Sequence, residues 1–193
     1  MSFDILFAFE EELARYTGAP YVVATDGCTH AVELVMRYYQ IRSVECTAYT
    51  YLSIIQTMAY LGIRYNLTGE QWIGEYQFHG TNIWDSARRL EPAMYRPGQI
   101  QCLSFGNTKP LQIGKMGAIL LDDVQAYHRL SAMRSDGRDL RTRPWQDQRT
   151  FSIGWHYCPT LEDCAKALSK LPTVQPQCQD VTYPDCRNIA IAH

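Results

Sequence analysis

The sequence has no long hydrophobic run. No apolar stretch in its 193 residues approaches the roughly 20 residues that a membrane-spanning helix needs. The opening stretch MSFDILFAFEEELARY mixes acidic with apolar side chains, and no basic segment precedes an uninterrupted apolar core, as a signal peptide would require. We therefore expect neither a membrane partner nor a secretory leader.

Neither sign of charge predominates. The chain has 18 Lys and Arg against 20 Asp and Glu, a formal net charge of -2, so it lacks the basic surface that nucleic acid or anionic lipid would require. With 46% hydrophobic and 20% charged residues, its composition is that of an ordinary globular domain. We expect small-molecule or protein partners and no nucleic acid.

The sequence also lacks a C-x-x-C pair. Its seven cysteines are odd in number and widely separated, which argues against a disulfide framework and against a zinc site. They are Cys28, Cys46, Cys102, Cys158, Cys164, Cys178 and Cys186. We predict no metal and a reducing compartment, the cytoplasm.

What the sequence does contain is an alternation of β-rich and helical segments. Residues 3–16 place apolar side chains at helical spacing, and the helix should stop at TGAP, because Gly18 favours a left-handed C-terminal conformation and Pro20 cannot continue the helix. Strands are expected at YVVAT, VECTAY, IRYNL, NIWD, IQCLSF and AILLDD, and helices at HAVELVMRYYQI, TYLSIIQTMAYLG, DVQAYHRLSAMRSDG and TLEDCAKALSKL. This alternation predicts an α/β fold with a mostly parallel sheet and helices on both faces.

Two stretches do not follow the alternation. Residues 66–81 show no clear period and receive no assignment. From Pro172 onward the chain is interrupted by prolines, which predicts an extended tail over residues 172–193, following a domain over residues 1–171.

Polar residues follow several of the expected strands. Ligands of parallel sheets bind at the carboxyl ends of the strands. This rule selects residues 26–29, 49–51, 85–88 and 104–109. Their side chains are the candidates for a binding site.

The first of these segments, TDGCTHAVEL, is a glycine turn that opens a helix. Free backbone N–H groups at the positive end of a helix form an anion site that suits a phosphate. The alternative is that Asp26 or Thr29 only caps the helix.

Asp85 ends an apolar strand, so its carboxylate should be partly buried and should need a cationic partner. That partner is either a nearby arginine, Arg88 or Arg89, in a structural ion pair, or the protonated ring nitrogen of a cofactor.

Tyrosines and a lysine complete the candidate set. Tyr49 and Tyr51 could stack on a ring or pack in the core. Lys109, desolvated at a strand end, could act as an amine nucleophile toward an aldehyde, or it could be a solvated loop lysine like Lys115. An anion cradle, an aromatic face, a carboxylate and a lysine match the phosphate, ring, ring nitrogen and aldehyde of pyridoxal 5'-phosphate.

The motifs resemble those of the DegT/DnrJ/EryC1/StrS family, the pyridoxal-phosphate-dependent sugar aminotransferases of fold type I. FEEELARYTGAPYVVATDGCTHAVEL is similar to the family's opening helix, strand and phosphate-binding turn, and AYTYLSIIQTMAYLGIRY to its T-F-x-A-x-x-x-A-I stretch. WDSARRL resembles E-D-A-A-H/Q-A-L, CLSFGNTKPLQIGKMGAILLDD resembles S-F-x-x-x-K-x-L-x-x-G-x-G-G, and GWHYCPTLEDCAKAL resembles G-Y-N-Y-R-M-T-D-x-Q-A-A.

The resemblance implies a role for each matched residue. It makes Lys109 and Asp85 catalytic, with Lys109 forming the Schiff base with the cofactor and Asp85 on the pyridine nitrogen. The cofactor-binding residues would be Gly27, Cys28, Thr29, Tyr51, Asp85, Arg88, Ser104, Lys109 and, from the partner subunit of a homodimer, His156.

The chain also departs from the family pattern. Arg88 stands where His or Gln contacts the ring hydroxyl, His156 replaces an asparagine that reaches the neighbouring subunit's phosphate, and Cys158 replaces the following arginine. Family members are about twice as long, so the resemblance implies a truncated large domain with the small C-terminal domain largely missing.

The implied function is transfer of an amino group from an amino-acid donor, usually glutamate in the family, to a keto group of a nucleotide-linked sugar. Two alternatives remain open. One is a pyridoxal-phosphate enzyme of another reaction class, such as elimination or racemisation, since a fold does not fix a reaction. The other is a relative that binds the cofactor without catalysis.

Overall fold

The computed structural model describes residues 3–142, 144–180 and 183–189. Its α-helices are α1 (Asp4–Thr17), α2 (Cys28–Tyr38), α3 (Leu52–Tyr60), α4 (Val124–Met133) and α5 (Leu161–Lys170), with short 3-10 turns η1 (Trp145–Asp147), η2 (Leu171–Thr173) and η3 (Cys186–Asn188). Its strands are β1 (Tyr21–Thr25), β2 (Ser43–Thr47), β3 (Arg64–Thr68), β4 (Tyr76–Gln77), β5 (Ile83–Asp85), β6 (Arg89–Leu90), β7 (Ile100–Ser104), β8 (Gly117–Leu121) and β9 (Gln177–Cys178). No helix in these described ranges has both the length and the apolar character to cross a membrane.

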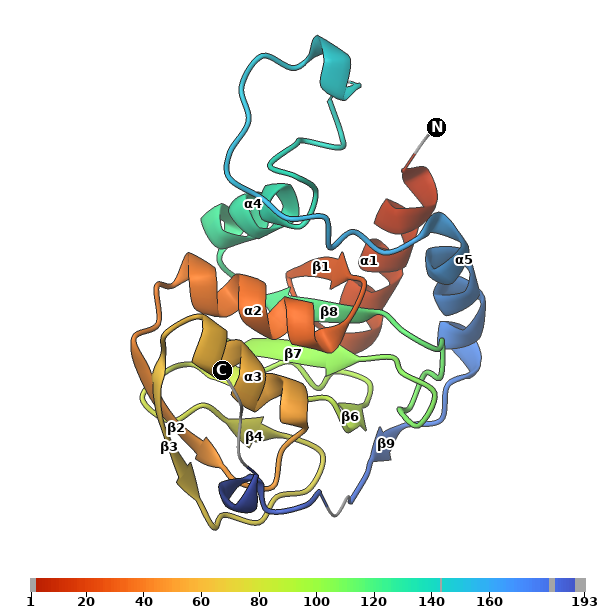
Figure 1. Cartoon of the computed structure of the whole chain (residues 1–193). Helices are drawn as coiled ribbons and strands as arrows, with labels where there is room; N and C mark the ends of the chain where they lie inside the picture. The colour runs from red at the N-terminus through yellow and green to blue at the C-terminus, as the bar shows by residue number, and fades with distance from the viewer. Residues whose placement is uncertain (1–2, 143, 181–182, 190–193) are drawn as a thin grey trace.

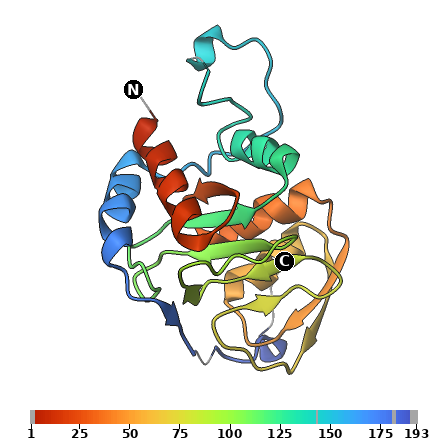
Figure 2. The same cartoon turned by 180° about the vertical axis from the view of Figure 1, so that it is seen from behind.

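A central sheet separates two layers of helices. Helices α2, α3 and α4 cover the face toward the viewer in Figure 1, and α1 and α5 cover the opposite face, which is in front in Figure 2. Successive strand residues point to opposite faces: Ile119 packs in the core beneath α2 and α4, whereas Ala118 and Leu120 pack against α1 and α5. The α/β class with helices on both faces is therefore confirmed.

The sheet itself is mixed rather than mostly parallel. Its five strands are ordered β1-β8-β7-β5-β4, and only β5 and β7 pair in parallel. The reason lies in the connections: no helix separates β7 from β8, so the chain turns back and β8 runs antiparallel to both of its neighbours. Strands β2 and β3 form a separate parallel pair.

Strand direction still brings the predicted segments to one edge. Because β8 is antiparallel to both β1 and β7, these two strands run in the same direction, and β5 is parallel to β7. The carboxyl ends of β1, β5 and β7 therefore meet at the same edge of the sheet, together with the beginning of β8.

The first helix and the sheet are joined by a buried ion pair. Arg134, at the end of α4, donates to the Glu10 carboxylate of α1 and to the Ala24 carbonyl of β1. Glu10 also accepts from the Ala24 N–H at 2.9 Å. The predicted end of the first helix is confirmed, since Gly18 is left-handed with φ of 77°.

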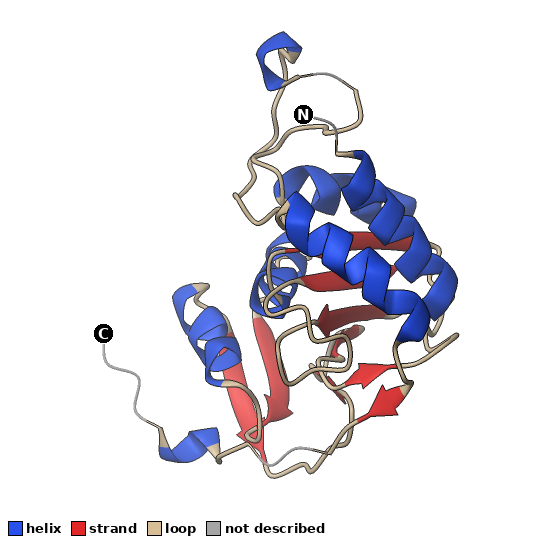
Figure 3. Cartoon of the chain, turned by 90° about the vertical axis from the view of Figure 1, so that its right-hand side faces the viewer, coloured by secondary structure: helices blue, strands red, loops and turns tan. Residues whose placement is uncertain are grey.

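The chain between α4 and α5 projects away from the sheet. In the side view of Figure 3 this segment, with the turn η1, lies at the top of the molecule beside the N-terminal end of α1. It exposes the apolar side chains of Trp145, Phe151 and Ile153.

Helix α5 follows its N-cap residue Thr160, whose Oγ1 accepts from the Asp163 N–H at 3.1 Å. We expect Thr160→Ala to lower the free energy of unfolding by about 1 kcal/mol, because one N–H of the first turn loses its acceptor. For a chain of this size, that is a fall in Tm of about 2–4 °C. Thermal unfolding checks it, with Thr160→Ser as the control that keeps the hydroxyl. An equal loss in both variants would contradict the capping role.

Candidate active site

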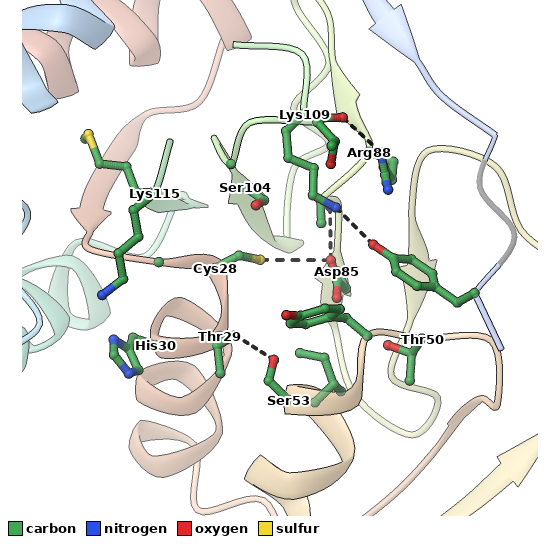
Figure 4. Close-up of a pocket in the computed structure, with 18 of the residues that line it drawn as sticks. Cys28, Thr29, His30, Thr50, Ser53, Asp85, Arg88, Ser104, Lys109 and Lys115 are labelled. Atoms are coloured by element: carbon green, nitrogen blue, oxygen red, sulfur yellow. Dashed lines mark hydrogen bonds between the residues drawn. The ribbon is translucent and has the colours of Figure 1, made fainter. Parts of the chain in front are cut away.

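A cavity of about 600 Å³ opens at the carboxyl edge of the sheet. Its walls come from the ends of β1, β5 and β7, the first turns of α2 and α3, the loop from β7 to β8, and one residue near the C-terminus, Tyr183. The predicted site residues that line it are Gly27, Cys28, Thr29, Tyr51, Asp85, Arg88, Ser104 and Lys109. The structure thus brings together all the predicted residues except His156 (Figure 4).

Helix α2 points its first turn into this cavity without a side-chain cap. Gly27 at the N-cap position is extended, and the Asp26 carboxylate is engaged elsewhere, 2.5 Å from His30 Nδ1 and 3.4 Å from Lys115 Nζ. Thr29 Oγ1 lies 2.7 Å from Ser53 Oγ on α3. The alternative that Asp26 or Thr29 caps α2 is therefore wrong, and no side chain in the described part of the chain caps the N–H groups at this helix end.

Asp85 is 4% exposed at the end of β5. Its Oδ1 accepts from the Ala87 N–H and its Oδ2 from the Tyr76 hydroxyl, both at 3.0 Å. Burial raises the pKa of Asp85, against the lowering effects of the Ala87 N–H, the Lys109 charge and the Tyr76 hydroxyl. The carboxylate is thus hydrogen-bonded, but its removal from water disfavours the charged form.

Neither arginine proposed as a structural partner pairs with Asp85. Arg88 Nη1 donates to the Thr108 carbonyl and to Gln179 Oε1, and Arg89 pairs with Glu75 and Glu91. No ion pair to Asp85 is present within the described part of the chain. A buried carboxylate that lines a cavity and has no ion-pair partner there fits a cationic ligand atom.

Cys28, the first residue of α2, faces Asp85. Its Sγ is 4.0 Å from Asp85 Oδ1 and 3.7 Å from the Cys102 carbonyl oxygen, and Figure 4 shows the side chain pointing toward Asp85. Burial, followed by the Asp85 charge, raises the pKa of Cys28 well above its usual value. The thiol therefore stays protonated and is not a nucleophile at neutral pH.

Lys109 is not a solvated loop lysine. It lies in the loop between β7 and β8, where its N–H donates to the Gly106 carbonyl at 3.0 Å, and its side chain reaches into the cavity. The amine Nζ donates to the Tyr183 hydroxyl at 3.0 Å, the bond drawn from Lys109 in Figure 4. Lys115, six positions along, has a side chain 70% exposed and contacts Asp26.

Aromatic and hydroxyl side chains complete the cavity. Tyr51 immediately precedes α3 and is 60% exposed, so it is not a core residue. Ser104 ends β7 and lines the same cavity as Lys109.

His156 lies outside the cavity of its own chain. Its side chain is 84% exposed, and its Nδ1 is 3.0 Å from Asp136 Oδ2. Its predicted contact with a partner subunit is not tested by a single chain and stays a prediction.

Sequence reasoning missed several residues of the cavity wall. They are His30, Ser53, Trp72, Tyr76 and Tyr183. Tyr76 pairs directly with Asp85 across β4 and β5, and both Trp72 and Tyr76 belong to the unassigned stretch 66–81. The aromatic residues of that stretch were the available signal for a cavity wall. Its strand β4 is only two residues long, too short to show the alternating pattern of a strand.

Comparisons with known proteins identify a related family and fold. The model of the DegT/DnrJ/EryC1/StrS aminotransferase family matches residues 4–67, which include α1, β1, α2 and α3. No match was found among the curated proteins.

Solved structures extend the match to most of the chain. AtS13 from Actinomadura melliaura superposes with a TM-score of 0.75 at 18% identity, over 89% of this chain and 60% of its own. The aminotransferase PseC of Helicobacter pylori, involved in pseudoaminic acid biosynthesis, gives 0.74 at 15% identity, over 88% and 57%. The sugar aminotransferase CalS13 from Micromonospora echinospora gives 0.69 at 16% identity, over 87% and 60%.

The chain therefore spans no more than about 60% of the length of these structures. At such identities the likeness establishes the fold, that of the large domain of fold type I aminotransferases. The structure and the family model thus confirm that this chain resembles the DegT/DnrJ/EryC1/StrS aminotransferase family.

Proposed function

We propose that the chain is a pyridoxal 5'-phosphate-dependent aminotransferase. In this proposal it moves an amino group from an amino acid, glutamate by the family resemblance, to a keto group of a nucleotide-linked sugar. The observation that carries the proposal is the placement of Lys109 and the unpaired, buried Asp85 in one cavity that also holds an uncapped helix N-terminus.

The donor set fits the proposed cofactor. The N–H groups at the start of α2, with the hydroxyls of Thr29 and Ser104, would hold the phosphate. Asp85 would hold the protonated ring nitrogen, and Tyr51 offers a face for the ring. Arg88 stands at the position that the resemblance assigns to the ring hydroxyl.

The cofactor, when bound, supplies an aldehyde that condenses with amines and a ring that accepts electrons. The residues of this chain supply the rest. Lys109 Nζ would hold the aldehyde and, as a free amine once the donor has bound, would move the proton between the donor's α-carbon and the cofactor. Asp85 would keep the ring nitrogen charged, because the buried carboxylate has no ion-pair partner among the described residues.

A titration with pyridoxal phosphate tests the proposal. We expect a visible absorbance band that borohydride abolishes, with the reduced cofactor located on Lys109 by peptide mass analysis. Added glutamate should then convert the cofactor to pyridoxamine phosphate. A band that glutamate leaves unchanged would point to another donor or reaction class, and absence of any band would indicate a relative without this chemistry.

We also propose that the chain acts as a homodimer, with His156 of each subunit facing the cavity of the other. The exposure of His156 outside its own cavity supports this arrangement, as does the apolar surface of Trp145, Phe151 and Ile153 nearby in the sequence. Light scattering at micromolar concentration should give twice the mass of one chain. A mass of one chain at that concentration would contradict the proposal.

A further inference from the structure

The C-terminal tail returns to the cavity after α5. Strand β9 of the tail pairs with β6, which directly follows Asp85 and Arg88. The Gln179 N–H donates to the Arg88 carbonyl at 2.9 Å, and Gln179 Oε1 accepts from Arg88 Nη1 at 3.2 Å. The tail is therefore tied to the segment that carries two of the predicted site residues.

A second anchor lies beyond the cavity. Cys186 is 4% exposed, and its N–H donates to the Ala48 carbonyl at 3.0 Å, just after β2. Its Sγ lies 3.4 Å from the Thr50 carbonyl oxygen. Tyr183 is thus held between two fixed points of the tail, one on each side in the sequence.

Tyr183 lines the same cavity as the start of α2. Its ring stacks on Trp72 with centroids 6.1 Å apart at an interplanar angle of 21°, and it lies 6.2 Å from the Tyr51 ring. The Arg88 guanidinium carbon is 5.6 Å from the same ring. These contacts fix the ring, so the position of its hydroxyl is fixed as well.

That hydroxyl contacts the Lys109 amine in the cavity. Tyr183 Oη accepts from Lys109 Nζ at 3.0 Å, and Nζ is also 5.7 Å from the ring centroid. An unbranched lysine side chain has many rotamers, so one fixed acceptor at its tip selects among them. The acceptor comes from 74 residues further along the chain.

We propose that Tyr183 is a positioning residue for Lys109: the tail supplies a phenol oxygen that holds the lysine amine in the centre of the cavity. This inference rests on the proposed function, which gives Lys109 its role in catalysis. The hydrogen bond between Lys109 and Tyr183 is nevertheless present in the protein without cofactor. The tail thus takes part in the site rather than only covering the body.

The first test measures Lys109 reactivity without cofactor. Limiting acetic anhydride is added to the wild type, Tyr183→Phe and Tyr183→Ala, and peptide mass analysis gives the acetylation rate of Lys109 relative to Lys115. We expect this ratio to rise about fivefold in Tyr183→Phe, the effect of losing one hydrogen bond, and further in Tyr183→Ala. Tyr65→Phe, on the exposed strand β3, should leave the ratio unchanged.

The second test distinguishes positioning from shielding. The rate at which borohydride fixes pyridoxal phosphate on Lys109 is measured for the same variants. A positioning role predicts that Tyr183→Phe lowers this rate several-fold while acetylation rises, because the amine is freer but less well oriented. A rise in both rates would show that Tyr183 only shields the lysine and would overturn the proposal.

The two tests also separate the two proposals. Normal incorporation into the wild type with an acetylation ratio unchanged by Tyr183→Phe would contradict the Tyr183 role alone. No incorporation into the wild type would contradict the proposed function and, with it, the positioning role.

Discussion

Replacing Lys109 with alanine is expected to abolish the borohydride-stable attachment of pyridoxal phosphate and to lower amino transfer by a factor of about 10³ or more. The amine both binds the aldehyde and moves the proton, and acid–base catalysis by a positioned group alone is worth about 10²–10⁴. Within the cavity lining, the other lysine is Lys115, which is held outward by Asp26. Peptide mass analysis after reduction and the rate of keto acid formation from the donor measure the two effects.

Lys115→Ala is the matched control, because it removes a lysine from the same loop. We expect it to keep the attachment at Lys109 and to retain activity within a few-fold. Attachment that persists in Lys109→Ala, or that is lost equally in Lys115→Ala, would mean that the aldehyde does not react at Lys109.

Asp85→Asn is expected to lower amino transfer by about 10²–10³, the effect of removing one preorganised electrostatic contact from a buried site. The amide keeps the shape of the carboxylate but cannot hold a proton on the ring nitrogen by charge. Amino transfer under saturating cofactor measures the loss. Asp147→Asn, in the exposed turn η1, is the control and should show wild-type activity.

The same substitution should stabilise the free protein at neutral pH. Burial raises the pKa of Asp85 in the folded state, so the folded protein keeps this proton to a higher pH than the unfolded chain does. Stability from this group is therefore greatest below the ordinary aspartate pKa and is lost as the pH rises toward the folded-state pKa. Asparagine does not ionise, so the variant has no such loss of stability with pH. Its amide can donate to the Tyr76 hydroxyl, which can in turn donate to Thr50 Oγ1, 2.6 Å away.

Denaturant unfolding between pH 4 and 8 checks this expectation. The difference in the free energy of unfolding between Asp85→Asn and the wild type should grow with pH and favour the variant. A variant less stable than the wild type at pH 8 would show that the Asp85 charge is stabilised in the free protein and would weaken its assignment to a cationic ligand.

Sequence reasoning located the candidate site because that site depends on local features. Strand ends follow from apolar runs and turn residues, and three strands that run in the same direction bring Gly27, Asp85 and Ser104 to one edge. The rule that ligands bind at the carboxyl ends of strands depends only on the direction of each strand, so it selects the same edge in this mixed sheet.

Other features depend on partners distant in the sequence. A fully buried strand such as β8 is apolar whichever direction it runs, so its reversal could not be read from its composition. The aromatic wall formed by Trp72 and Tyr183 joins an aperiodic stretch to a proline-rich one, and neither has a pattern of its own. Only the folded chain shows that these two stretches meet.

The reversal of β8 also has a consequence for folding. Because β7 and β8 are adjacent antiparallel strands, with Ser104 paired to Gly117, the loop that carries Lys109 is closed by its own two flanks. Closing so short a loop costs little chain entropy, and contacts between near neighbours form early in folding. The hairpin that carries Lys109 can thus form locally, before the distant segments that supply Asp85 and Tyr183 pack against it.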